Sequence, residues 1–298
     1  MTAIAPQTPR APRAAVWAKL RIVLEMIKIE HTLFALPFAL MGALLAARGL
    51  PSAWQLGWIL AAMVGARSAA MAFNRLVDRD YDARNPRTAN RALPAGLVSV
   101  PFVAGFTAAA SALLVLAAFM LNGLAFALSP LALLIVFFYS YTKRFTAWSH
   151  AFLGLALAVA PVGAWIAVRG EWGMPALWLG AAVVCWLIGF DIIYALQDLE
   201  FDRGAGLRSM PVALGPARAL WVGRAAHALM IVCLVQVGRA ADLGAIYYAG
   251  VTLAALLIAA EHALVGPDDL RRLNVAFFNL NVAVSVGLLL FTALDLWL

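Results

Sequence analysis

Residues 174–202 read MPALWLGAAVVCWLIGFDIIYALQDLEFD, an apolar run over 174–197 that ends in a cluster of acidic side chains. A helix needs about 20 predominantly apolar residues to cross the hydrocarbon core of a bilayer. The rest of the chain has the same character: its 298 residues are 64% hydrophobic and 12% charged, where a soluble domain carries about 25% charged residues. A water-soluble fold could not cover so much apolar surface. The bilayer is therefore predicted to be part of the protein's solvent.

Working outward from this run, the sequence contains nine apolar stretches separated by short polar breaks. They lie at approximately 22–47, 53–73, 99–121, 124–141, 147–168, 174–197, 217–237, 243–264 and 273–296. The prediction is an all-α, polytopic membrane protein with about nine transmembrane helices in a single bundle. Residues 1–20 are expected to form a cytoplasmic tail, and residues 21–298 one membrane domain.

The distribution of basic residues predicts how the bundle is oriented. With the amino terminus inside, nearly all Lys and Arg fall in cytoplasmic segments, and only Arg48, Arg169 and Arg239 fall on the other side. The net charge of +7 therefore reflects membrane orientation, and no nucleic-acid partner is expected. Nothing in the sequence indicates an obligatory protein partner. Cys185 and Cys233 lie within apolar runs and are predicted to be buried free thiols.

Two acidic segments repeat with the same pattern. Residues 78–82 read DRDYD and close the second apolar stretch, whereas residues 198–202 read DLEFD and close the sixth. Each has an acid, any residue, an acid, an aromatic residue and an acid, and each is followed by an arginine and a proline. The spacing of four spans predicts two parallel four-helix repeats.

Helical spacing predicts which acidic side chains of these segments lie on the same face of a helix. Residues four apart share a helix face, so Asn74, Asp78 and Asp82 are predicted to form one stripe. Asp191, Asp198 and Asp202, at spacings of seven and four, form another. Neighbouring carboxylates repel unless a cation neutralises them, and all-oxygen ligands suit Mg²⁺, which typically shares phosphate oxygens with a substrate. The stripes predict a site for Mg²⁺ and a diphosphate.

Basic side chains stand where such an anion would need them. Lys143 ends the fourth stretch, one helical turn after Tyr139, and it is followed by Arg144. The arginines that flank the acidic stripes, and are predicted to bind substrate, are Arg67, Arg87, Arg91, Arg203 and Arg208. Glu30, near the cytoplasmic half of the first stretch, is a further candidate, because ionisable groups within a membrane are functional by default. His150 and His227 are instead predicted to bond locally, without a carboxylate partner.

Three elements of the sequence resemble the UbiA superfamily of intramembrane prenyltransferases. Residues 74–82, NRLVDRDYD, with the loop RTANRALPAG at 87–96, are similar to the first signature of that family. The pattern Asp191-x2-Tyr194-x3-Asp198-x3-Asp202 is similar to the second, and Tyr139-x3-Lys143-Arg144 to a third element. Many members have Asp where this chain has Arg75, so a metal role is not expected there. The phrase IEHTLFALP at 29–37 resembles the 4-hydroxybenzoate polyprenyltransferase-like members.

The resemblance implies a reaction and roles for these residues. Asn74, Asp78 and Asp82 would hold one Mg²⁺, and Asp198 and Asp202 a second, with Asp191 in support. The ions would bind a polyprenyl diphosphate, whose allylic carbon would alkylate an aromatic acid while Lys143 and nearby arginines stabilise the leaving diphosphate. The acceptor would be 4-hydroxybenzoate-like, for quinone biosynthesis, or a dihydroxynaphthoate, for menaquinone. The implied location is a cell inner membrane, with the active site on the cytoplasmic side; whether that membrane is bacterial or organellar is left open by the sequence.

Two other classes of protein share some of these features. Ion-coupled transporters also combine many spans with acidic residues, but they place charges near the bilayer midplane, often in inverted repeats. Membrane phosphotransferases also use paired aspartates, but their wider sequence pattern is missing here. The parallel repeat and the clustering of charge at one end favour the prenyltransferase.

Overall fold

A computed structural model describes the whole chain except residues 1–21, 24, 26–31, 268 and 274. The described part is helical and contains no β-strand. The long helices are α2 (Thr32–Ala47), α3 (Ala53–Val77), α5 (Val100–Leu121), α6 (Gly123–Thr142), α7 (Ser149–Arg169), α8 (Met174–Ala195), α11 (Pro216–Ala240), α12 (Ala245–Leu264) and α13 (Asn281–Trp297). The short ones are α4 (Arg79–Arg84), η2 (Leu196–Asp198), α9 (Leu199–Gly204), α10 (Met210–Leu214) and η3 (Val275–Leu280).

Local sequence explains where these helices start and stop. Ser52 caps α3 by accepting from the backbone N–H of Gln55, whose side chain returns to Ser52 in a capping box. Ser99 and Asn122 cap α5 and α6 with a single hydrogen bond each, accepted from the backbone N–H of Phe102 and of Ala125. Gly170 ends α7 at φ +68°, a conformation that glycine adopts without strain. The short polar breaks in the sequence therefore act as helix boundaries.

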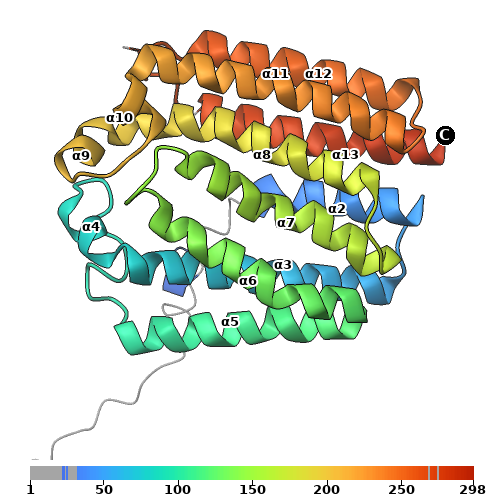
Figure 1. Cartoon of the computed structure of the whole chain (residues 1–298), viewed down its shortest axis with the longest axis horizontal. Helices are drawn as coiled ribbons and strands as arrows, with labels where there is room; N and C mark the ends of the chain where they lie inside the picture. Colours follow the sequence, from blue (N-terminus) through green and yellow to red (C-terminus); the bar gives the residue numbers. More distant parts are fainter. Residues whose placement is uncertain (1–21, 24, 26–31, 268, 274) are drawn as a thin grey trace, which may run out of the picture.

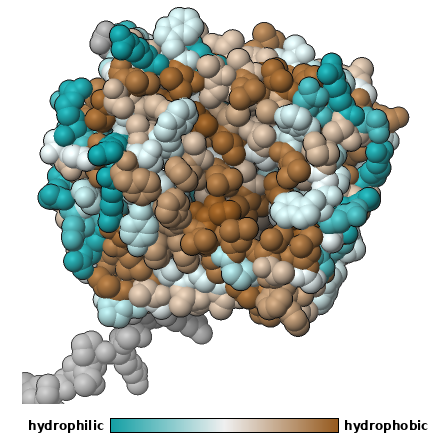
Figure 2. All heavy atoms as spheres, viewed as in Figure 1, coloured by the Kyte–Doolittle hydropathy of each residue, from teal (hydrophilic) through white to brown (hydrophobic). Residues whose placement is uncertain are grey.

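Eight helices in the described residues are long and apolar enough to cross a membrane. The sixth predicted stretch continues through η2 and α9, so that one candidate span runs over Met174–Gly204. The first predicted stretch, 22–47, lies partly outside the described residues, and its described helix α2 is shorter than the others. Figure 2 shows apolar side chains across the middle of one face and hydrophilic ones gathered toward its two opposite edges. The protein is a multi-pass membrane protein.

The helices form one bundle in which α2 and α7 lie between two groups (Figure 1). Helices α3, α5 and α6 lie on one side, and α8, α11, α12 and α13 lie on the other. The short helices α4, α9 and α10 gather at one end, where the acidic segments are. The helices approach closely where small residues meet: a Cβ on Gly65 of α3 would lie 2.9 Å from the carbonyl oxygen of Ala110 of α5.

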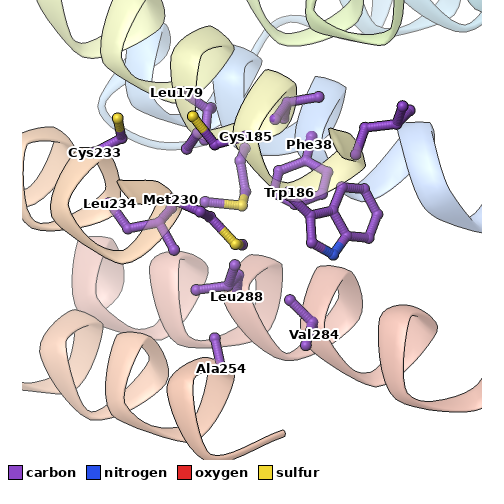
Figure 3. Packing of buried hydrophobic residues seen from close by; sticks show 14 of the residues in the cluster. Phe38, Leu179, Cys185, Trp186, Met230, Cys233, Leu234, Ala254, Val284 and Leu288 are labelled. Atoms are coloured by element: carbon purple, nitrogen blue, oxygen red, sulfur yellow. The ribbon is translucent and has the colours of Figure 1, made fainter. Parts of the chain in front are cut away.

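The largest group of buried apolar residues lies around α8 (Figure 3). Trp186 is fully buried and packs against Phe38 of α2, with ring centroids 4.9 Å apart. Cys185 and Cys233 lie in the same region, and both are buried and free as predicted. This packing fixes α8 and the acidic segment that follows it against the neighbouring helices.

A buried polar chain ties α8, α12 and α13 together. The Trp186 Nε1–H donates to Asn281 Oδ1 over 2.6 Å, and Asn281 Nδ2 donates to Glu261 Oε1 over 3.0 Å. Both Asn281 and Glu261 are fully buried. Lipid offers no replacement partners for these groups, so the single amide of Asn281 satisfies both neighbours.

We expect Asn281→Leu to destabilise the folded protein. The change removes both partners at once, and a buried polar group left unpaired costs about 1–3 kcal/mol. The melting temperature in detergent, read by thiol labelling or by loss of monodisperse protein, should fall clearly. Asn279→Leu is the control, because Asn279 is exposed. Equal melting temperatures for the two variants would contradict this role of Asn281.

Candidate active site

The first acidic segment lies where α3 gives way to α4. Helix α3 ends at Val77, Asp78 has φ −94° and ψ 7°, and α4 starts at Arg79. Asn74, in the last turn of α3, donates to Asp78 Oδ2 over 2.8 Å. The helix is therefore interrupted at Asp78, but the backbone hydrogen bonds between residues four apart continue across the break, from the N–H of Asp78 to the carbonyl oxygen of Asn74 over 2.9 Å and from the N–H of Asp82 to that of Asp78 over 2.8 Å. That Asn74, Asp78 and Asp82 act as one ligand stripe stays a prediction.

The second acidic segment contains the same interruption of the helix. Asp198 has φ −98° and ψ 3° and joins η2 to α9. Helices α4 and α9 each contain six residues and start directly after the aspartate. The matching geometry supports a relation between the two segments, while the four-span repeat as a whole stays a prediction.

Basic side chains connect the second acidic segment to the first half of the bundle. The Arg87 guanidinium donates to both carboxylate oxygens of Asp198, from Nε over 2.8 Å and from Nη2 over 2.6 Å. Lys143, at the end of α6, lies with its Nζ 3.4 Å from Asp202 Oδ2. Both aspartates are buried, so these pairs are largely shielded from water.

Arginines pair with the first acidic segment as well. Arg144 Nη2 lies 3.3 Å from Asp78 Oδ1, and Arg91 Nη1 donates to Asp82 Oδ1 over 2.7 Å. The buried Arg75 lies with Nη1 3.7 Å from Asp82 Oδ2. The side chains of the adjacent Lys143 and Arg144 thus pair with opposite segments, and this brings the two acidic clusters to one place.

The sequence predicted that a cation neutralises the stacked carboxylates, and in this structure arginine and lysine side chains do so. Among the described residues, no three His, Cys, Asp or Glu side chains are grouped closely enough to hold a metal ion by themselves. The pairs explain this, because each aspartate turns toward a basic partner. Three of the basic residues expected to bind a substrate anion, Arg87, Arg91 and Lys143, hold these carboxylates.

The pKa values outside the membrane spans follow from this arrangement. Burial, together with the neighbouring Asp82, raises the pKa of Asp78, although Arg144 and Asn74 oppose the shift. Burial acts against the charge of Lys143, but Asp202, Asp191 and Asp198 outweigh it and raise its pKa. Burial likewise opposes the charge of Arg87, and Asp198 and Tyr194 raise its pKa. Lys143 and Arg87 are therefore held as cations.

A cavity of about 670 Å³ opens between the two clusters and extends into the bundle. The predicted site residues that line it are Arg67, Asn74, Asp78, Asp82, Arg87, Arg91, Tyr139, Lys143, Asp191, Asp198 and Asp202. Arg203 and Arg208 are described but do not line it: Arg203 pairs with Glu200 at the surface, and Arg208 donates to the carbonyl oxygen of Phe145. Glu30 lies outside the described residues. The structure thus gathers most of the predicted site at one cavity.

Other residues of the site were not singled out from the sequence. The buried Asn85 orients the loop after α4, with its Oδ1 accepting from the N–H of Arg87 and its Nδ2 3.5 Å from Asp198 Oδ1. The Tyr194 hydroxyl accepts from Arg87 over 2.9 Å. Asn85 follows the first acidic segment by three residues, but its partner Asp198 is 113 residues away in the sequence, so local spacing carried no signal for this contact.

His150 corrects a prediction. It was expected to lack a carboxylate partner, but its Nδ1 lies 2.6 Å from Asp191 Oδ2. The start of α7 packs beside the last turns of α8, which brings the two residues together across 41 positions. His227, in contrast, contacts His262 and the carbonyl of Trp186, as expected of a local hydrogen-bonding residue.

Comparison with known proteins agrees with this geometry. The model of the UbiA prenyltransferase family matches residues 35–283. The chain is 31% identical to the 4-hydroxybenzoate octaprenyltransferase of Shewanella sediminis, over 93% of this chain and 96% of that protein, and 33% identical to that of Nitrosospira multiformis, over 81% and 83%.

Solved structures show the same fold. The apo structure of a UbiA homolog from Aeropyrum pernix K1 superposes with a TM-score of 0.81 at 38% identity, covering 90% of this chain and 98% of that one. A UbiA homolog from Archaeoglobus fulgidus bound to GPP and Mg²⁺ superposes with a TM-score of 0.66 at 21% identity, covering 91% and 99%. The chain belongs to the UbiA prenyltransferase family.

Proposed function

We propose that this protein is an integral-membrane aromatic prenyltransferase that moves a polyprenyl group from its diphosphate to 4-hydroxybenzoate, in quinone biosynthesis. The observation that carries the proposal is the convergence of two acidic clusters and their basic partners on one apolar cavity. The relatives named 4-hydroxybenzoate octaprenyltransferase support the choice of acceptor. A dihydroxynaphthoate acceptor is the alternative.

The residues of the site fit Mg²⁺. Asn74, Asp78 and Asp82 offer oxygen ligands on one side of the cavity, and Asp198 and Asp202 on the other. Asp82 Oδ2 is buried and makes no hydrogen bond within the described residues, and its ion-pair partner Arg75 Nη1 lies 3.7 Å away, so its lone pairs are available to a metal ion. We infer two ions, one for each cluster. Bound Mg²⁺ would draw negative charge from the diphosphate oxygens as the allylic carbon–oxygen bond breaks.

The chain's own cations act on the same leaving group. Arg87, Arg91 and Lys143 line the same cavity as the aspartates, and they would donate to the phosphate oxygens of a diphosphate bound there. The lysine stays charged because carboxylates surround it. Placed in this way, the three cations stabilise charge that develops on the diphosphate.

The apolar part of the cavity suits the isoprenoid tail. Ala62, Ala66 and Ala70 line it at four-residue intervals along α3, where their small side chains leave room for a ligand. The lining also includes Leu131 of α6 and Leu155 of α7, which are half-exposed on the outside of the bundle. A long chain could therefore pass between these helices into the lipid. The surrounding apolar walls would keep water from an allylic cation.

The acceptor's carboxylate is assigned to Arg67. This residue lies seven positions before Asn74 on α3, about 10 Å deeper in the bundle, and lines the cavity. A cation at that depth suits an anionic substrate group. The ring would then lie between the carboxylate site and the diphosphate site.

Arg67→Met should raise KM for 4-hydroxybenzoate by about tenfold or more, because a charge-assisted hydrogen bond is lost. KM for geranyl diphosphate should change little. Steady-state kinetics with each substrate varied in turn checks this expectation. Arg239→Met, at the far end of the bundle, is the control for loss of charge. An unchanged KM for 4-hydroxybenzoate in Arg67→Met would show that Arg67 does not bind the acceptor.

The location follows from the same reasoning. Bacterial relatives and the eight membrane helices support the inner membrane, and the excess of Lys and Arg at the end that holds the acidic clusters supports a cytoplasmic active site. The donor and the product are both lipids, so an enzyme within the bilayer reaches them directly.

The proposal is tested by incubating the purified protein in detergent with Mg²⁺ and geranyl diphosphate. 4-Hydroxybenzoate, dihydroxynaphthoate and homogentisate are offered in parallel, and products are identified by mass. We expect geranylated 4-hydroxybenzoate to dominate. A dominant naphthoate product would establish the alternative acceptor, and intact donor in all three reactions would overturn the proposed function.

A further inference from the structure

His150 joins three elements at the edge of the site. It lies in the first turn of α7, is 1% exposed, and contacts Asp191 of α8 and the backbone of Met210 at the start of α10. A buried imidazole in this position needs both ring nitrogens satisfied, and here each nitrogen has its own partner.

The hydrogen-bond network assigns the tautomer. The backbone N–H of Met210 points at Nε2 over 3.3 Å. An amide N–H can only donate, so Nε2 must accept and carries no proton. The ring proton is therefore on Nδ1, from which it is donated to Asp191 Oδ2 over 2.6 Å. Neutral His150 thus holds one oxygen of Asp191 by a short hydrogen bond.

The Asp191 side chain faces the cavity in which the aromatic acceptor is proposed to bind. This side chain is 18% exposed and lines the cavity. Asp191 lies seven residues before Asp198, about 10 Å below the acidic rim, whereas Arg67 lies eleven residues before Asp78, about 16 Å below it. His150 engages Oδ2, which leaves Oδ1 for a ligand held between the depth of Arg67 and the rim.

We propose that His150 is a positioning residue that orients the Asp191 carboxylate as the proton acceptor for ring alkylation. The inference rests on the proposed function. In the step, the allylic carbon–oxygen bond breaks and its electron pair leaves with the diphosphate. The new bond forms between the allylic carbon and a ring carbon, and the proton on that ring carbon passes to Asp191 Oδ1, restoring aromaticity. The pair is oriented for this step because His150 fixes the rotation of the carboxylate.

Two substitutions at His150 separate the contacts it makes. Asparagine places its amide N–H near the position of Nδ1 and can still donate to Asp191. Glutamine reaches the position of Nε2, so it can keep the Met210 contact but not the Nδ1 donor. We expect His150→Gln to lower kcat by about 10- to 100-fold, the usual effect of losing a hydrogen bond to a charged group. His150→Asn should retain most of kcat. KM for geranyl diphosphate should stay the same in both.

A double-mutant comparison and an activity-independent measurement complete the test. If His150 acts through Asp191, the double variant H150Q/D191N should be no slower than Asp191→Asn alone. Nitrogen NMR of ¹⁵N-histidine-labelled wild type should show one Nδ1-protonated ring that disappears in His150→Gln, whether or not the enzyme turns over.

The outcomes distinguish this inference from the proposed function. Additive losses in the double variant, equal kcat for His150→Asn and His150→Gln, or a ring protonated on Nε2 would each overturn the positioning role. A melting temperature that falls in parallel with kcat would do so too, since it would indicate a purely structural residue. If wild-type protein makes no prenylated product but the Nδ1-protonated ring is found, the proposed function fails and the contact stands.

Discussion

Replacing Asp198 with asparagine should lower kcat for prenyl transfer by about 1000-fold or more. The side chain keeps its size but loses the charge that pairs with Nε and Nη2 of Arg87 and that is proposed to bind Mg²⁺. Loss of a metal ligand removes several kcal/mol of transition-state stabilisation, which corresponds to a factor of this size. Pyrophosphate release and product mass, measured together at saturating Mg²⁺, check the prediction.

A further variant makes the Asp198 result specific. Glu200→Gln removes an exposed carboxylate from α9, the short helix that follows Asp198, and should leave kcat within about twofold, as surface substitutions usually do. Activity in Asp198→Asn within tenfold of wild type would contradict a metal role for Asp198.

Replacing Lys143 with methionine should lower kcat by about 100- to 1000-fold, as removal of one charge-stabilising donor does in other active sites. Methionine has a similar length but cannot donate, so the leaving diphosphate loses its ammonium partner. The change also leaves Asp202 without its ion pair. The rate of pyrophosphate release under single-turnover conditions isolates the chemical step from product release.

The matched control for Lys143 is Arg218→Met, which removes an exposed cation at the start of α11. Lys143→Arg should keep part of the activity, because it keeps the charge but changes the donor geometry. A kcat for Lys143→Met close to that of Arg218→Met would show that Lys143 serves orientation in the membrane and not catalysis.

The sequence predicted the helical bundle well because apolar length is a strong signal. An apolar stretch as long as 174–197 can be accommodated in few ways other than as a membrane-spanning helix. The structure has this helix at Met174–Ala195. The two acidic segments were recognised from repeated letters alone. Their convergence on one cavity was expected from the spacing of four spans and from the family resemblance.

The interruptions of the helix at Asp78 and Asp198 and the ion pairs were beyond this reasoning. Helical spacing assumes an uninterrupted helix and carries no signal for such a break. The pair of Arg87 with Asp198 joins positions 111 residues apart, and that of Lys143 with Asp202 joins positions 59 apart. Such contacts depend on how the helices pack in the folded bundle. Local spacing could identify the basic and acidic residues involved, but it could not predict which of them pair. The same applies to His150 and Asp191.

The most direct test of the central claim is calorimetric binding of geranyl diphosphate with and without Mg²⁺. The claim is that both acidic clusters hold one Mg²⁺–diphosphate complex. It predicts that wild-type protein binds the diphosphate only with Mg²⁺, that Asp78→Asn and Asp198→Asn each weaken binding by at least tenfold, and that Asp80→Asn and Glu200→Gln do not. Binding that is equally tight in EDTA, or that is lost in only one of the two cluster variants, would contradict it.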